Sequence, residues 1–160
     1  EEYDRTTGRF VDRALIPTPR HHVAAVASPT HVYVTGGRRP NPGGGSDVNV
    51  AAFDRYNVAE DRWERLPNVP TARSGHGAGL VDGKVVVLGG EDPSAGGSPS
   101  IAETEEYDIG RNIWGRSYPG MFRPRHGVAA VTIGNDIYVF LGASRAALAP
   151  TASSDVLLTP

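Results

Sequence analysis

The feature that most constrains this chain is a unit of roughly 50 residues that recurs along its 160 residues. A glycine pair at Gly36-Gly37 returns as Gly89-Gly90 and, in degraded form, as Gly142-Ala143, with the same spacing of 53 residues both times. Periods in this range mark solenoids, propellers and repeat arrays. Because one such unit cannot bury its own apolar face, the sequence predicts copies that stack on one another.

Three further features recur in the same order in every copy. An aromatic residue followed by Asp stands at Tyr3-Asp4, Phe53-Asp54 and Tyr107-Asp108. A second large aromatic follows each pair, at Phe10, Trp63 and Trp114. A His opens an apolar run at His21, His76 and His126, and an arginine precedes each one, at Arg20, Arg73 and Arg125. Trp63 and Trp114 are predicted to be wedges between neighbouring units.

The segments between the glycines and prolines have the character of short β-strands. Gly (20 residues) and Pro (13 residues) supply frequent turns, while residues 22–28, 76–82 and 126–132 are rich in Val, Ala and Gly. Two-residue turns such as Asp82-Gly83 lead into continuous apolar runs, which are typical of strands buried on both faces. The sequence has no sustained helical periodicity, so it predicts an all-β architecture.

This order of features resembles the kelch motif, in which a strand opened by His and Gly precedes a strand ending in two glycines, a Tyr-Asp strand and a Trp strand. The resemblance implies a kelch-type β-propeller with blades of four antiparallel strands and three blade equivalents in this chain. We divide the chain into blades at 19–70 and 71–121 and the two parts of a split blade at 1–18 and 122–160. Another meander of antiparallel strands is the alternative fold.

The two ends of the chain are expected to belong to one blade. Residues 1–18 contain the end of a third strand and a fourth strand, whereas 122–160 contain a first, second and third strand, with SDVLLTP at 154–160 aligned to SDVNVAA at 46–52. Propellers have about four to eight blades, so we expect a second copy of the chain to complete a six-bladed ring by dimerisation. Alternatively, the missing blades lie on another polypeptide or in a longer protein, and the start at Glu1 favours a processed or excised piece.

Strand direction places the expected binding residues at one mouth of the propeller. In an up-and-down blade, the segment before the first strand and the loop between the second and third strands meet there. These loops, at 38–47, 91–100 and 144–154, are rich in Gly, Pro and Ser, and loops on a rigid scaffold commonly carry binding sites. The ligand-binding candidates are Arg20, His21, Arg38, Arg39, Arg73, His76, Asp92, Arg125, His126 and Arg145.

The candidates fall into two groups. The Arg/His pairs that repeat in every blade favour a structural role, because guanidinium groups can donate hydrogen bonds to strand-end carbonyls. Arg38, Arg39, Asp92 and Arg145 differ between copies, so we expect them to set specificity. A ring of His could bind a metal, but the carboxylates or Cys that usually complete such a site are missing from the expected mouth. We therefore predict no metal, no cofactor and no catalytic residue.

Composition and charge exclude several kinds of partner. The formal net charge of −2 argues against nucleic acid, because phosphate binding needs a basic excess. The sequence has neither an apolar stretch of membrane-spanning length nor a signal peptide, so we expect a soluble protein without a membrane partner. The chain has no Cys, which leaves the compartment open, and we favour the cytoplasm slightly.

These expectations favour a non-enzymatic binding or protein-interaction scaffold. Its long-loop mouth, positively charged by the arginines, would bind an acidic peptide or protein; this step is analogy, because a fold does not determine function. A second hypothesis is an enzyme, because some proteins that resemble this family are carbohydrate oxidases or sugar epimerases, although nothing here matches their metal-site residues. A third hypothesis is a half-propeller that assembles with itself and has no ligand.

Overall fold

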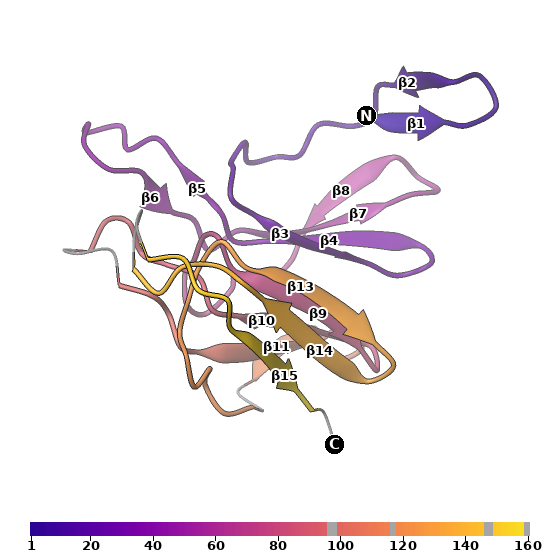
Figure 1. Cartoon of the computed structure of the whole chain (residues 1–160). Coiled ribbons are helices and arrows are strands. Elements are labelled where there is room, and N and C mark those ends of the chain that lie inside the picture. The colour runs from indigo at the N-terminus through magenta and orange to yellow at the C-terminus, as the bar shows by residue number, and fades with distance from the viewer. Residues whose placement is uncertain (96–98, 116–117, 146–148, 159–160) are drawn as a thin grey trace.

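The computed structural model describes residues 1–95, 99–115, 118–145 and 149–158, and every regular element within these ranges is a β-strand. The strands form three antiparallel sheets that lie side by side in chain order, together with two small ribbons (Figure 1). The architecture is all-β, as the sequence predicts. Two of the sheets have the four strands of a propeller blade.

The strands of each blade follow one another in chain order. The first blade consists of β3 (Ala24–Ala27), β4 (His31–Thr35), β7 (Phe53–Asn57) and β8 (Arg62–Arg65). The second consists of β9 (Gly77–Val81), β10 (Lys84–Leu88), β11 (Thr104–Asp108) and β12 (Ile113–Gly115). The third contains β13 (Ala129–Ile133), β14 (Asp136–Phe140) and β15 (Ser154–Leu157). The ribbons are β1 (Glu2–Asp4) with β2 (Arg9–Val11), and β5 (Arg38–Arg39) with β6 (Val48–Asn49).

Strand pairing corrects the alignment of the aromatic-Asp feature in the first blade. Tyr56 pairs with Trp63 across two strands, as Tyr3 pairs with Phe10 and Tyr107 with Trp114. Asn57 accepts backbone hydrogen bonds within the following turn, as Asp4 and Asp108 do. The equivalent pair is therefore Tyr56-Asn57 rather than Phe53-Asp54, and the two aromatics are always seven residues apart.

The final segment also needs a new alignment. Asp155 pairs with Val139, as Asp54 pairs with Val34 and Glu105 with Val87. Residues 154–157 therefore correspond to 53–56, not to 46–49 as the shared letters SDV suggest. By the same register, residues 1–3 correspond to 155–157, so both ends of the chain carry a third-strand segment.

The glycine pair of the third blade lies one residue earlier than the sequence alignment places it. Gly36 and Gly37 have φ angles of 56° and 100°, and Leu141 and Gly142 have 58° and 92°. The degraded pair is thus Leu141-Gly142, not Gly142-Ala143. A Cβ atom on Gly36 would lie 2.6 Å from the carbonyl oxygen of Arg73 in the next blade, which explains the glycine. Leu141 has room because it is 58% exposed.

Two hydrophobic clusters join the three blades. The first contains Tyr33 and Phe53 from the first blade and Val87 and Tyr107 from the second, with Trp114 packed against it. Phe53 and Trp114 lie 5.3 Å apart between ring centroids, which confirms the expected inter-blade wedge. The second cluster joins Val81, Val86 and Leu88 of the second blade to Ile137 and Val139 of the third.

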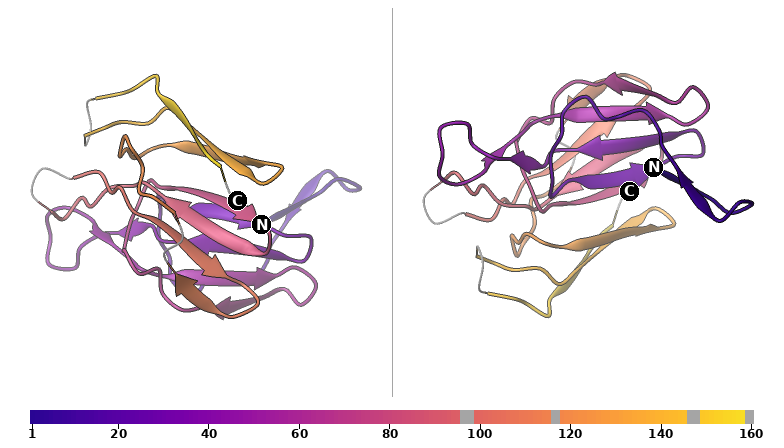
Figure 2. Two further views of the ribbon diagram at one scale, coloured as in Figure 1. Left: turned by 90° about the horizontal axis from the view of Figure 1, so that it is seen from below. Right: turned by 90° about the horizontal axis from the view of Figure 1, so that it is seen from above.

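The outer face of the third blade is uncovered in the described structure. Figure 2 shows the sheet of β13, β14 and β15 at one end of the stack. Val131, Ile133 and Phe140 are exposed on this face, whereas Ile137 and Val139 point back into the second cluster. The β1–β2 ribbon pairs with no other sheet and lies well away from β15 (Figure 1).

We predict that Leu141→Gly stabilises the chain by about 1 kcal/mol, because a left-handed non-glycine residue costs roughly 1–2 kcal/mol and this side chain is largely exposed. Gly89→Ala is the matched control and should destabilise by about 2 kcal/mol or more, since its Cβ would lie 2.7 Å from the carbonyl oxygen of Arg125. Urea unfolding of both variants measures the two effects. A loss of stability in Leu141→Gly would contradict the equivalence of Leu141 with Gly36 and Gly89.

Candidate functional site

The structure brings the segments before the first strands and the loops after the second strands to one mouth. His21 forms a β-bridge with Arg38, Ser74 with Glu91, and His126 with Ala143. The first of these loops is partly regular, because residues 38–39 and 48–49 pair as β5 and β6. Residues 96–98 and 146–148 of the other two loops lie outside the described residues.

Three of the candidate arginines are part of the frame. The side chain of Arg73 is buried; it donates to the carbonyls of Gly89 and Glu103 at 2.8 Å each and pairs with Glu105 at 2.6 Å. The same arrangement recurs in each blade, where a buried guanidinium group pairs with a third-strand carboxylate: Arg20 with Asp54, Arg73 with Glu105, and Arg125 with Asp155, whose side chain is 34% exposed. The guanidinium groups of Arg20, Arg73 and Arg125 thus contact carbonyls and carboxylates of their own blade, which favours the structural role.

His76 is not equivalent to His21 and His126. Ser74 occupies their position directly after the arginine, and His76 stands two residues further on, where Val23 and Val128 stand in the other blades. The His76 ring is buried, and its Nε2 lies 2.8 Å from Oγ1 of Thr35. Burial, with a smaller effect from the charge of Arg73, lowers the pKa of His76 to about 3. In the described structure, His76 is therefore a buried, neutral packing residue.

A polar cluster that spans all three blades lies at the mouth. Arg38 of the first blade pairs with Glu91 of the second at 2.7 Å, and Glu91 lies 3.5 Å from Nδ1 of His126 in the third. Nε2 of His22 accepts from Arg38 at 3.1 Å. Burial lowers the pKa of His22, and so does the charge of Arg38. We call His22, Arg38, Glu91 and His126 the rim network.

Sequence reasoning missed two members of this network, His22 and Glu91, and a neighbouring carboxylate, Asp47. Asp47 lies 3.2 Å from Nε2 of His21 and 3.5 Å from Nε of Arg38. The sequence contains one signal that could have identified Glu91 as a rim residue. Like Arg38 and Ala143, it directly follows the second glycine of its blade. Carboxylates are therefore present at this mouth, contrary to expectation. Even so, the described residues contain no group of three or more His, Asp or Glu placed to hold a metal.

The remaining candidates divide by exposure. The side chain of Asp92 accepts from the backbone and hydroxyl of Ser94, so it braces a local turn. Arg39 and Arg145 are exposed. The backbone carbonyl of Arg145 lies 3.1 Å from Nε2 of His126, which ties this loop to the rim network. Of the candidate arginines, Arg39 and Arg145 are the two whose side chains face solvent.

Comparison with known proteins agrees with this geometry. The family model of the Kelch motif matches residues 19–70 and 72–114, which is more than half of the chain. The chain belongs to the kelch-repeat family. Kelch-like protein 25 of Rattus norvegicus is 32% identical over 151 residues, covering 89% of this kelch chain and 24% of the relative. Beta-scruin of Limulus polyphemus is 32% identical over 142 residues, covering 88% of the chain and 15% of the relative.

The solved structure of YjhT has the same fold. Its TM-score is 0.72 at 16% identity, and the match covers 91% of the kelch chain and 54% of the solved chain. The kelch chain thus spans about a quarter of Kelch-like protein 25 and about half of the solved structure. Among the described residues, no helix is long and apolar enough to cross a membrane.

We predict that Arg73→Met destabilises the kelch chain by about 3–5 kcal/mol, because it leaves the buried carboxylate of Glu105 without its ion-pair partner. Arg39→Met, at an exposed position of the same mouth, is the matched control and should change the free energy of unfolding by less than about 0.5 kcal/mol. Urea unfolding compares the two variants. Equal effects would show that the buried arginine is not a structural anchor.

Acid should destabilise the chain partly through His76. Its folded-state pKa, at about 3, lies below the usual 6.5, so the unfolded state binds the proton first. Stability is then lost as the pH falls from 6.5 toward 3, by at most about 1.4 kcal/mol per pH unit. His76→Val, which copies the residue at this position in the other blades, should remove this component. The free energy of unfolding of the wild type and of His76→Val is measured at pH 7.5, 6 and 5. An equal loss with falling pH in both proteins would refute the prediction.

Proposed function

We propose that this kelch chain is a non-enzymatic binding module whose loop mouth engages a partner protein. The observation that carries the proposal is the contrast between the frame and the mouth. Each blade repeats a pair between a buried arginine and a third-strand carboxylate, while the residue after the second glycine changes from Arg38 to Glu91 to Ala143. A constant scaffold with different side chains at equivalent rim positions is the arrangement that binding loops need.

The charges at the mouth narrow the kind of partner that we propose. The buried arginines are neutralised by Asp54, Glu105 and Asp155 within their blades. Arg38 is likewise paired with Glu91 and lies near Asp47. Among the candidate arginines of the mouth, Arg39 and Arg145 are the two whose charge is open to a partner. We propose that an acidic peptide segment of the partner contacts these two arginines above the rim network.

The six-bladed ring formed by two chains stays a proposal as well, and Leu141 weighs against its simplest form. At both existing junctions, the glycine at this position approaches the arginine carbonyl of the next blade, with Cβ sites 2.6 and 2.7 Å from that oxygen. A following blade that docked in the same way would bring its carbonyl against Cβ of Leu141. Ring closure at the third blade would therefore need a wider junction than the two in the structure.

We predict that Arg39→Glu/Arg145→Glu weakens binding of an acidic probe, poly-L-glutamate, about tenfold at low salt, which equals about 1.4 kcal/mol. Fluorescence anisotropy with a labelled probe measures the affinity, and urea unfolding checks that the fold is retained. Arg5→Glu/Arg111→Glu makes the same change in net charge at exposed positions in the turns of the opposite mouth and is the matched control. Equal losses in both double variants would attribute binding to net charge alone and overturn the proposed mouth.

A further inference from the structure

In each complete blade, the aromatic residue of the fourth strand donates a hydrogen bond to an equivalent position in the chain. The indole Nε1 of Trp63 donates to the carbonyl of Ala14, and that of Trp114 donates to the carbonyl of Pro67, each at 2.8 Å. Both carbonyls stand six residues before the buried arginine of their blade, Arg20 or Arg73. The same position before Arg125 is Pro119.

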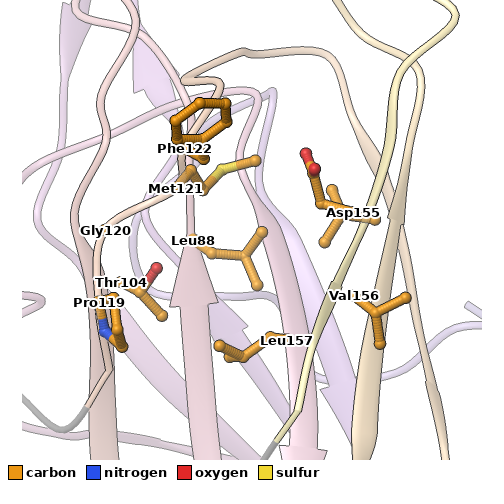
Figure 3. A pocket seen from close by; sticks show the side chains of 10 residues that line it. Leu88, Thr104, Pro119, Gly120, Met121, Phe122, Asp155, Val156 and Leu157 are labelled. Atoms are coloured by element: carbon orange, nitrogen blue, oxygen red, sulfur yellow. The ribbon is translucent and has the colours of Figure 1, made fainter.

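Pro119 lines an apolar groove of about 270 Å³ between the second and third blades. Figure 3 shows the side chains of Leu88, Met121 and Leu157 turned toward one another across this groove. Its volume is below the roughly 300–1,000 Å³ of small-molecule pockets, so it suits one large side chain. We call this groove the third socket; its lining includes Leu88, Thr104, Pro119, Met121, Val139 and Leu157.

Comparison with the preceding junction shows what the third socket is shaped to hold. By strand register, Thr104 and Leu157 correspond to Phe53 and Tyr107. At the junction of the first two blades, those two rings hold Trp114, with centroid distances of 5.3 and 5.4 Å. At the third socket, the aromatic ring among the lining residues is that of Phe122, which belongs to the segment before Arg125 and not to a fourth strand. Among the described residues, β15 has no strand on its outer edge.

We propose that the third socket binds Phe10, carried on strand β2 of a second copy of this chain. Phe10 pairs with Tyr3 as Trp63 and Trp114 pair with their tyrosines, so it is the fourth-strand aromatic of the N-terminal ribbon. It is 68% exposed in its own chain. Figure 1 shows its ribbon apart from β15 of the same chain, so we assign the exchange to a second copy.

The exchange has a defined register. Residues 1–3 and 155–157 hold equivalent third-strand positions, so β2 can leave β1 and pair with β15 instead. In the exchanged pair, Phe10 lies opposite Leu157, and Val11 lies opposite Val156. Val156 and Phe10 are exposed in the single chain, so the exchange removes apolar surface from water and gives the open edge of β15 a partner. It does not require the tight junction that Leu141 opposes.

Sedimentation equilibrium of the full 160-residue chain tests the exchange. We expect a dimer, a dissociation constant at least tenfold higher for Phe10→Ala, and a lower one for Phe10→Trp, whose indole N–H can donate to Pro119 as Trp114 donates to Pro67. Val58→Ser, at an exposed position in the β7–β8 turn, is the control and should leave the constant unchanged. A folded wild-type monomer, or a dimer indifferent to Phe10→Ala, would overturn the proposal.

A cysteine pair tests the register independently, because the natural chain contains no Cys. Directly paired residues on antiparallel strands have Cα atoms about 4.5–5.5 Å apart, within the range for a disulfide. A Val11→Cys chain mixed with a Val156→Cys chain should form a disulfide-linked heterodimer under mild oxidation, detected on a non-reducing gel. A mixture of Val11→Cys with Val58→Cys should not. Equal linkage in both mixtures would refute the register, and none of these variants alters the arginines of the proposed mouth.

Discussion

The buried arginine before each first strand is the interaction on which the rest of this structure depends. Its side chain joins strand-end carbonyls to a third-strand carboxylate, as Arg73 joins Gly89 and Glu103 to Glu105. Its own carbonyl accepts from the second glycine of the preceding blade, at 2.8 Å for the bond from Gly37 to Arg73. One residue therefore fixes both the interior of its blade and the position of the blade before it. A buried charge of this kind is tolerated only while it stays fully paired, so the anchor specifies geometry more than it adds stability.

This anchor explains why the glycine pair is needed and what its loss at Leu141 implies. The arginine carbonyl comes so close to Gly36 and Gly89 that a Cβ atom would overlap it. Leu141 has the same left-handed backbone as these glycines, although the side chain makes it costly. The backbone of the second strand thus turns outward in the same way in all three blades. The third blade differs in the surface that it presents to a neighbour. Leu141 opposes a further blade that packs against the open face, but it does not oppose a strand that pairs with the edge of β15.

The fold could be predicted from the sequence because glycines, aromatics and alternating strands recur in fixed order, but the alignment within the repeat could not be read from letters alone. The matches of Phe53-Asp54 and His76 were wrong because identical letters occur at neighbouring positions, whereas the constant quantities are the seven-residue aromatic spacing and the distance from each arginine. The candidate site was predicted less well. Burial of Arg73 and Arg125 follows from pairing with carboxylates 30 or more residues away in sequence. Glu91 escaped notice because its ion pair crosses from one blade to the next.

In the rim network, Arg38 and Glu91 neutralise each other, whereas Arg39 and Arg145 of the neighbouring loops are exposed. Arg38 donates to Glu91 on one side and to His22 on the other. Partial burial and the charge of Arg38 lower the pKa of His22, which favours the neutral ring that accepts this hydrogen bond. Arg38 is thereby held between two blades and offers little free charge, whereas Arg39, the next residue, is exposed. Of these two adjacent arginines, Arg38 joins two blades, whereas the side chain of Arg39 is exposed to solvent. A change at Arg38 should therefore disturb the alignment of the blades and the mouth together, whereas a change at Arg39 should alter the mouth alone.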